Sequence, residues 1–141
     1  MEPSSVKLVT QAWLLRGISS LPGKLSLRDE RIAFRAHGSG NLWPSQLRKL
    51  EQQLRVDELA VRLEREESLN LFDLPLHDIT RIHFPWYTFS GGMNLMIHGV
   101  WIRFGFDHPA NSAAPPGGRD PLGEISSARK AGKAWKMALG L

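Results

Sequence analysis

The residues of this chain best suited to chemistry are basic side chains around the first predicted hairpin. Lys24 and Arg28 lie on one predicted strand, and Arg16 precedes the turn that leads to it. Because the mouth of a β-barrel gathers side chains around one opening, these three residues could hold an anionic headgroup. The alternative is a set of solvated charges at a strand edge, which the neighbouring acids Asp29 and Glu30 favour.

A second basic cluster lies near the end of the chain, on a predicted helix. It contains Arg129, Lys130, Lys133 and Lys136. These cations could contact anionic lipid or phosphate, at about 1 kcal/mol for each charge near a membrane surface. Cations in the last turns of a helix also complement its dipole and aid solubility, and we favour this simpler interpretation.

Three aromatic residues, Trp86, Tyr87 and Phe89, precede a predicted loop tip at residues 90–92. An exposed aromatic loop could insert into a membrane interface or into the groove of a protein partner. Large aromatic side chains are usually buried, however, so the interpretation that Trp86 and Phe89 fold back onto the core is favoured.

Leu47, Leu50 and Leu54 recur at helical spacing after Pro44 and predict a short amphipathic helix. Their shared face suits the core of the domain. It would also serve as a self-association surface if the helix protrudes, and the sequence leaves both possibilities open.

No arrangement of side chains typical of an enzyme is found in the sequence. The histidines, at positions 37, 77, 83, 98 and 108, lack the spacing of metal ligands, and cysteine is absent. The neighbours His77 and Asp78 have no nucleophile in a Gly-x-Ser-x-Gly turn, and the segment 38–40 lacks the third glycine of a dinucleotide-binding fingerprint. We therefore expect a non-enzymatic protein without a cofactor or a metal.

The composition is that of one globular domain spanning residues 1–141. Hydrophobic residues make up 42% of the chain and charged residues 23%, which is inconsistent with intrinsic disorder. The net charge of +4 is a modest excess without charge runs, so no specific nucleic-acid partner is expected. The sequence has neither an apolar run near the roughly 20 residues of a membrane span nor the pattern of a signal peptide at its start. We expect a cytoplasmic protein, with binding to the membrane surface left open.

Alternating apolar residues predict a β-rich first half. Residues 6–15, 24–28 and 32–35 are typical of three strands in a meander, with a reversal over residues 18–23, where proline and glycine occur. Residues 58–66 fit either a strand or a continuation of the preceding helix, and we favour the strand.

The second half predicts further strands and one helix. Residues 69–84 contain two short extended pieces around a bend, and their prolines keep them away from the centre of a sheet. Residues 93–97 and 100–106 predict a hairpin. A mobile loop is expected over residues 107–119, followed by an amphipathic helix over residues 120–139.

About seven strands in meander order, followed by one C-terminal amphipathic helix, resemble the pleckstrin-homology-like fold, a β-barrel or sandwich capped by that helix. Residues 23–34 resemble the opening of GRAM domains, in which a glycine starts a strand and an apolar and aromatic strand follows a polar turn. Residues 72–82 resemble the aromatic-x-apolar-Pro-apolar-x-Asp-Ile segment of the same family. The leucine-rich stretch over residues 44–67 is an insertion relative to a minimal GRAM domain.

The resemblance implies a mainly β fold with a C-terminal helix and a short helical insertion. It also implies a binding or adaptor module for a protein or peptide partner or for an anionic membrane surface. Lys24 and Arg28 are too far apart to match the Lys-x-Arg pair of phosphoinositide-binding members, so the ligand is not implied. The alternative function is a homo-oligomer built through the leucine-rich insertion.

Overall fold

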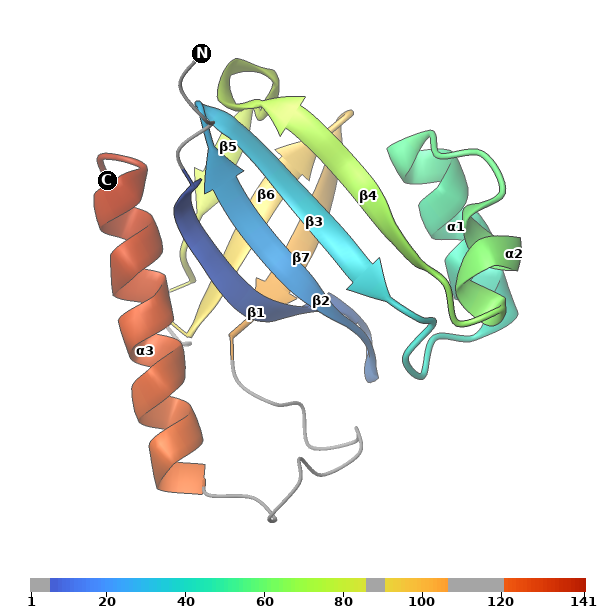
Figure 1. Ribbon diagram of the computed structural model, residues 1–141, viewed down its shortest axis with the longest axis horizontal. Coiled ribbons are helices and arrows are strands. Elements are labelled where there is room, and N and C mark those ends of the chain that lie inside the picture. Colours follow the sequence, from blue (N-terminus) through green and yellow to red (C-terminus); the bar gives the residue numbers. More distant parts are fainter. Residues whose placement is uncertain (1–5, 86–90, 107–120) are drawn as a thin grey trace.

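The computed structural model shows a strongly curled β-sheet with helices on two sides (Figure 1). The structure describes residues 6–85, 91–106 and 121–141, and it describes side chains from residue 8 onward and, in the last of these segments, from residue 128 onward. The aromatic residues Trp86, Tyr87 and Phe89 and the loop expected over residues 107–119 lie outside the described residues.

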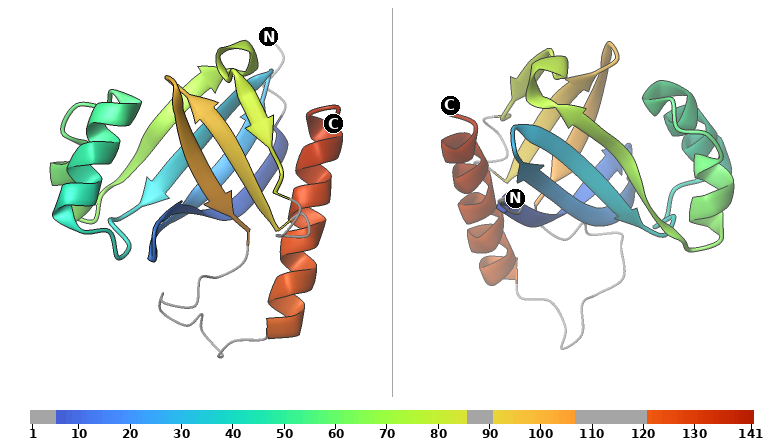
Figure 2. Two further views of the ribbon diagram at one scale, coloured as in Figure 1. Left: turned by 180° about the vertical axis from the view of Figure 1, so that it is seen from behind. Right: turned by 45° about the horizontal axis from the view of Figure 1, so that its top comes forward.

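The described strands form one antiparallel sheet. They are β1 (Val6–Arg16), β2 (Ser19–Arg28), β3 (Arg31–His37), β4 (Ser68–Pro75), β5 (Arg81–His83), β6 (Gly92–Ile97) and β7 (Val100–Gly105). Their order is β4-β3-β2-β1-β7-β6-β5, and β5, β6 and β7 fold back behind the first four strands (Figures 1 and 2). Within the described part of the chain no ladder joins the edge strands β4 and β5, so the sheet is open where a closed barrel was one expectation. The prediction of a mainly β fold with a C-terminal helix is confirmed.

Helices flank this sheet on opposite sides. They are α1 (Pro44–Leu54), α2 (Leu59–Glu64) and α3 (Pro121–Ala138), and a short 3-10 turn, η1 (Leu76–Asp78), connects β4 to β5. The first two lie together at one side of the sheet, and α3 runs along the other (Figures 1 and 2). No helix in the described residues is long and apolar enough to span a membrane.

The strand favoured for residues 58–66 is wrong, because these residues form α2. Leu59 and Leu63 are fully buried, whereas Val61 between them is 49% exposed. A strand would turn all three side chains to one face, whereas a helix turns residues 59 and 63 to one face and residue 61 to another, as observed. Of the two patterns that the sequence offered here, the helical spacing was therefore correct and the strand-like alternation was accidental.

The first hairpin also reverses earlier than predicted, at Gly17 and Ile18. Gly17 has a φ of 58°, which glycine adopts without strain. Pro22 and Gly23 instead lie inside β2. A Cβ atom on Gly23 would stand 2.3 Å from the carbonyl oxygen of Arg35 on β3, so this glycine serves the close approach of two strands and not a turn.

The core fills the space between the two halves of the sheet. Three aromatic rings lie at its centre: the centroid of Phe34 is 4.9 Å from that of Phe104 and 6.5 Å from that of Phe72. A β-bulge in β4 pairs Phe34 with Phe72 and Arg35 with Asn70, which leaves Leu71 unpaired. As a result, the consecutive residues Leu71 and Phe72 are both buried.

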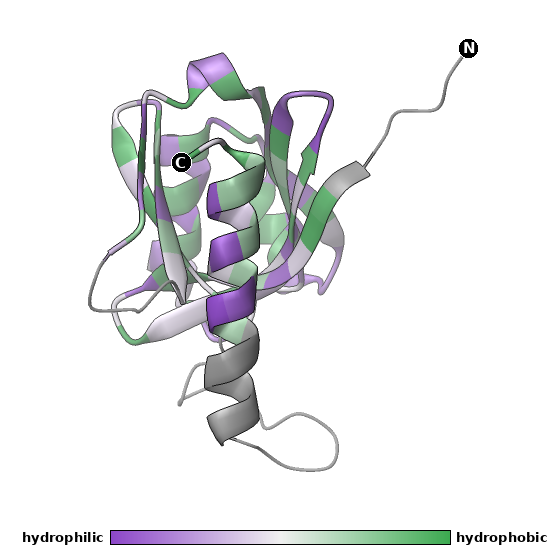
Figure 3. Cartoon of the chain, turned by 90° about the vertical axis from the view of Figure 1, so that its left-hand side faces the viewer, coloured by the Kyte–Doolittle hydropathy of each residue, from purple (hydrophilic) through white to green (hydrophobic). Residues whose placement is uncertain are grey.

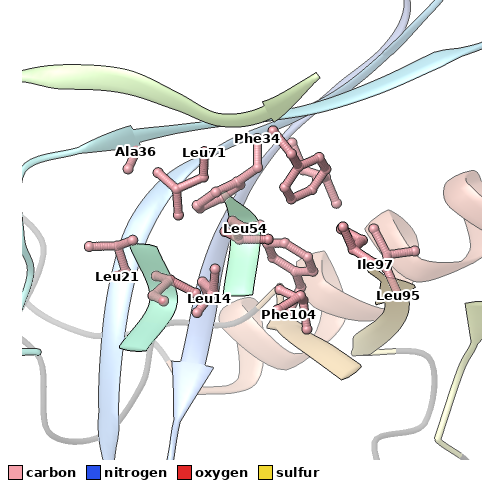
Figure 4. Packing of buried hydrophobic residues seen from close by; sticks show 14 of the residues in the cluster. Leu14, Leu21, Phe34, Ala36, Leu54, Leu71, Leu95, Ile97 and Phe104 are labelled. Carbon is pink, nitrogen blue, oxygen red and sulfur yellow. The ribbon is translucent and has the colours of Figure 1, made fainter. Parts of the chain in front are cut away.

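Leu47, Leu50 and Leu54 belong to this core and are at most 4% exposed. Figure 4 shows Leu54 of α1 among strand residues that include Leu14 and Phe104. The three leucines therefore do not form an exposed self-association face, because α1 packs against the sheet and does not protrude.

The C-terminal helix is held to the sheet by Trp135, which is fully buried. Its indole Nε1 donates a hydrogen bond to Oγ1 of Thr10 on β1, at 3.1 Å. Hydrophilic residues occupy the side of α3 turned away from the sheet (Figure 3). The observed end at Ala138 lies one residue from the predicted one.

Candidate functional site

Alternation along β2 and β3 divides their side chains between the core and the solvent. Leu25 and Leu27 on β2 and Ile32 and Phe34 on β3 are buried, so the intervening residues point outward. The outward side chains of β1 to β4 line an open depression of about 470 Å³. Its lining consists of Val9, Lys24, Ser26, Arg28, Asp29, Arg31, Ala33, Arg35, Asn70 and Asp73. We call this surface the cationic face.

Two pairs of cations stand directly opposite each other on the cationic face. Lys24 on β2 is the register partner of Arg35 on β3, and Arg28 is the register partner of Arg31. Like charges in directly opposed positions of a sheet oppose folding, whereas opposite charges there favour it. The domain thus holds four cations in an arrangement that its own stability does not favour.

Between the two cation pairs lies a row of uncharged residues. Val9 on β1 is opposite Ser26 on β2, and Ser26 is in turn opposite Ala33 on β3. The small side chains of Ser26 and Ala33 make the floor of the depression lower than the long cationic side chains at its ends. Asp73 on β4, opposite Ala33, closes this row at the far side.

The four cations differ in their partners. Arg31 donates from Nε to Oδ1 of Asp73 at 3.0 Å and from a second nitrogen to the Asp73 carbonyl oxygen at 2.9 Å. Arg35 donates to the carbonyl oxygen of Ser68 at 3.3 Å. The side chains of Lys24 and Arg28 have no hydrogen bond or ion pair with any residue that the structure describes, and both are exposed. They are the cations available to a ligand.

A tight turn sets the spacing of the second cation pair. Asp29 and Glu30 connect β2 to β3, and both adopt positive φ angles, of 49° and 60°. This is the geometry of a two-residue turn whose twist matches the flanking strands. It places Arg28 beside Arg31, and it leaves the Asp29 carboxylate at the rim of the depression.

Arg16, which the sequence groups with Lys24 and Arg28, lies elsewhere. On β1 it follows the core-facing residues Ala12 and Leu14 in the alternation, so it points to the opposite side of the sheet from Lys24. Its guanidinium donates to Oε1 of Gln53 on α1. Burial lowers the pKa of this guanidinium. The predicted cluster of three cations is therefore not formed.

The basic cluster of α3 does not contribute to the cationic face either. Arg129, Lys130 and Lys133 are exposed along the helix. Lys136 lies against the sheet side, with its Nζ atom 5.2 Å from the ring centroid of Phe84. Because none of the four lines the depression, the basic residues of α3 and the cationic face are separate surfaces.

Acidic and histidine side chains do not assemble into a metal site among the residues that the structure describes, where no group of three such ligands occurs. The pair His77 and Asp78 lies on η1, with 3.4 Å between Nε2 and Oδ1. The histidine side chain is 82% exposed, so the pair is a surface contact.

Sequence reasoning identified Lys24 and Arg28 but missed Arg31 and Arg35. The signal was present, because two alternating segments joined by a two-residue turn have only one natural register. Pairing residues outward from the Asp29 turn would have placed all four cations on one face.

A comparison of the chain with protein-family models, curated proteins and solved structures found no match.

Proposed function

We propose that this chain is a non-enzymatic binding module of the pleckstrin-homology-like, GRAM type, which takes an anionic partner on its cationic face. The order of seven antiparallel strands followed by a helix supports the fold part of the proposal. The helical insert α1 and α2 between β3 and β4 is the departure from that family's minimal pattern.

The observation that carries the proposal is the pair of directly opposed cations at each end of the depression. Lys24 opposite Arg35 weakens the sheet by the electrostatic repulsion of like charges, and Arg28 opposite Arg31 does so to a smaller degree, because the Asp73 carboxylate already pairs with Arg31. An anion placed between the two cations of such a pair attracts both of them, so the electrostatic energy of the pair becomes favourable. Binding an anionic group therefore relieves a repulsion that folding alone leaves in place.

The experiment is a fluorescence anisotropy titration with a fluorescein-labelled poly-L-glutamate probe, at low and at physiological salt. We compare the double variant Lys24→Gln, Arg28→Gln with Lys130→Gln, Lys133→Gln, which removes the same charge from α3. Since all four side chains are exposed, both variants are expected to fold, and circular dichroism and thermal unfolding verify this.

Salt-sensitive binding that falls at least fivefold in the sheet variant, and less in the helix variant, supports the cationic face. Equal losses in both variants would show that net charge alone attracts the probe. Greater loss in the helix variant would move the site to α3, and both of these results contradict the proposal.

A further inference from the structure

The two available cations of the cationic face lie on one strand, four residues apart. Successive residues of a strand advance by about 3.3 Å and alternate in direction, so Lys24 and Arg28 point to the same side about 13 Å apart. A partner that engages both must present two anionic groups at that separation.

The residue between them sets a second requirement. Ser26 lies midway, flanked by Val9 on one side and Ala33 on the other, and Val9 is 49% exposed. The centre of the depression is thus small, uncharged and partly apolar. A third anionic group there would meet no cation, only the Ser26 hydroxyl as a donor, and would approach the Asp73 carboxylate.

An extended peptide meets both requirements. Its side chains at positions i, i+2 and i+4 point to one side, and the first and last of them are also about 13 Å apart. We infer that the cationic face binds an extended peptide segment with the pattern acidic-x-apolar-x-acidic, aligned along β2. This inference rests on the proposed function and names the partner within it.

In the bound arrangement the two acidic side chains contact Lys24 and Arg28, and each also approaches the opposed arginine on β3. The Arg28 guanidinium offers two parallel donors to a carboxylate. The small or medium apolar side chain at i+2 rests on Val9 and on the floor made by Ser26 and Ala33.

Other anionic partners fit this surface less well. A nucleic-acid strand carries a charge at every nucleotide, so it brings phosphates over Asp73 as well as over the cations. A membrane surface is flat, and peripheral binding usually requires apolar side chains that insert. Among the described residues that line the depression, Val9 is the one large apolar side chain exposed to solvent.

The test uses three nonapeptides of one composition, each with a terminal fluorescein label, two aspartates, one valine and otherwise threonine and serine. The label lies outside the emission of the five tryptophans of the chain. The aspartates stand four, three or two positions apart. Anisotropy titrations measure the affinity of the whole chain for each peptide, and for phosphatidylserine vesicles and an oligothymidylate of matched charge.

We expect the peptide with aspartates four apart to bind about two- to fivefold more tightly than the isomer with aspartates three apart, the range that one exposed charge pair contributes. Arg28→Gln should abolish this preference, whereas Lys130→Gln should preserve it. Both results together support the inference.

Equal binding of all three isomers, still lost in Lys24→Gln, Arg28→Gln, would overturn the spacing rule and leave the anionic partner of the proposed function intact. Tighter binding of the vesicles or of the oligothymidylate through the same two cations would show that the peptide is the wrong class of partner. No binding of any probe would overturn the inference and the proposed function together.

Discussion

Reversing one charge on the cationic face should stabilise the domain while it removes binding. In Lys24→Glu the new carboxylate stands directly opposite Arg35, so a repulsive cross-strand pair becomes an attractive one. Lysine and glutamate are both poor strand formers of similar length, so little else changes at this exposed position.

The magnitude follows from the exposure of the pair. Cross-strand charge pairs contribute roughly 0.2–1 kcal/mol, with opposite sign for like charges, so the reversal should raise the free energy of unfolding by about 1 kcal/mol at low salt. For a chain of 141 residues this corresponds to a rise in Tm of about 3 °C. Lys24→Gln, which removes the repulsion without adding an attraction, should give about half of it.

Urea unfolding at low salt and in 1 M salt measures the change. The gain should shrink in high salt, because exposed charges are screened there. Lys130→Glu changes the net charge equally at an exposed position on α3 and should give no gain. A stability gain for Lys24→Glu that persists in 1 M salt, or a loss at low salt, would refute the electrostatic account of this face.

Three further variants test the fold that supports the face. Gly23→Ala should lower the free energy of unfolding by about 1–3 kcal/mol in urea titration, because the new Cβ meets the Arg35 carbonyl oxygen; an unchanged midpoint would contradict this close approach. Replacing Asp29 and Glu30 by Asn and Gly should raise the stability by about 1 kcal/mol, since asparagine and glycine adopt positive φ readily, and thermal unfolding should show a higher Tm. Leu50→Ala should cost about 2–5 kcal/mol without altering the mass measured by sedimentation, and a change of mass would revive this helix face as an interface.

Local patterns predicted most of the sheet correctly. Alternation located β1, β6 and β7 within a residue or two, and the prolines correctly assigned β4 and β5 to the sheet edges. These predictions succeed because alternate residues of a half-buried strand are apolar, and this pattern is visible within a few neighbouring residues.

Where the pattern was short or ambiguous, tertiary contacts decided the outcome. Leu59, Val61 and Leu63 fit a strand as well as a helix, and only the packing of α2 against the core separates the two. The glycine in β2 matched turn chemistry, but its role depends on a carbonyl oxygen of β3 that is distant in sequence. Neither fact is present in a window of neighbouring residues.

Two of the four cations of the candidate site could be predicted from local sequence. Lys24 and Arg28 lie on one strand an even number of residues apart, so the sequence indicates that they face one side. Arg16 was wrongly grouped with them because it is near them in the hairpin, although the alternation along β1 turns its side chain to the other face of the sheet. The partners of Lys24 and Arg28 on β3 follow from the register, which becomes certain once the Asp29 turn is known.

The bulge in β4 reverses which side chains of this strand face the core from residue 72 onward. Under strict alternation through this strand, Phe72 would face the solvent and Asp73 would face the core. The extra residue exchanges them, and it thereby brings the Asp73 carboxylate to Arg31. One backbone irregularity thus pairs Arg31 with an acid, and because Arg35 donates to the Ser68 carbonyl oxygen, Lys24 and Arg28 remain as the two available charges in line. The number of cations available to a partner therefore depends on the extra residue of the bulge, Leu71, which is buried and does not contact that partner.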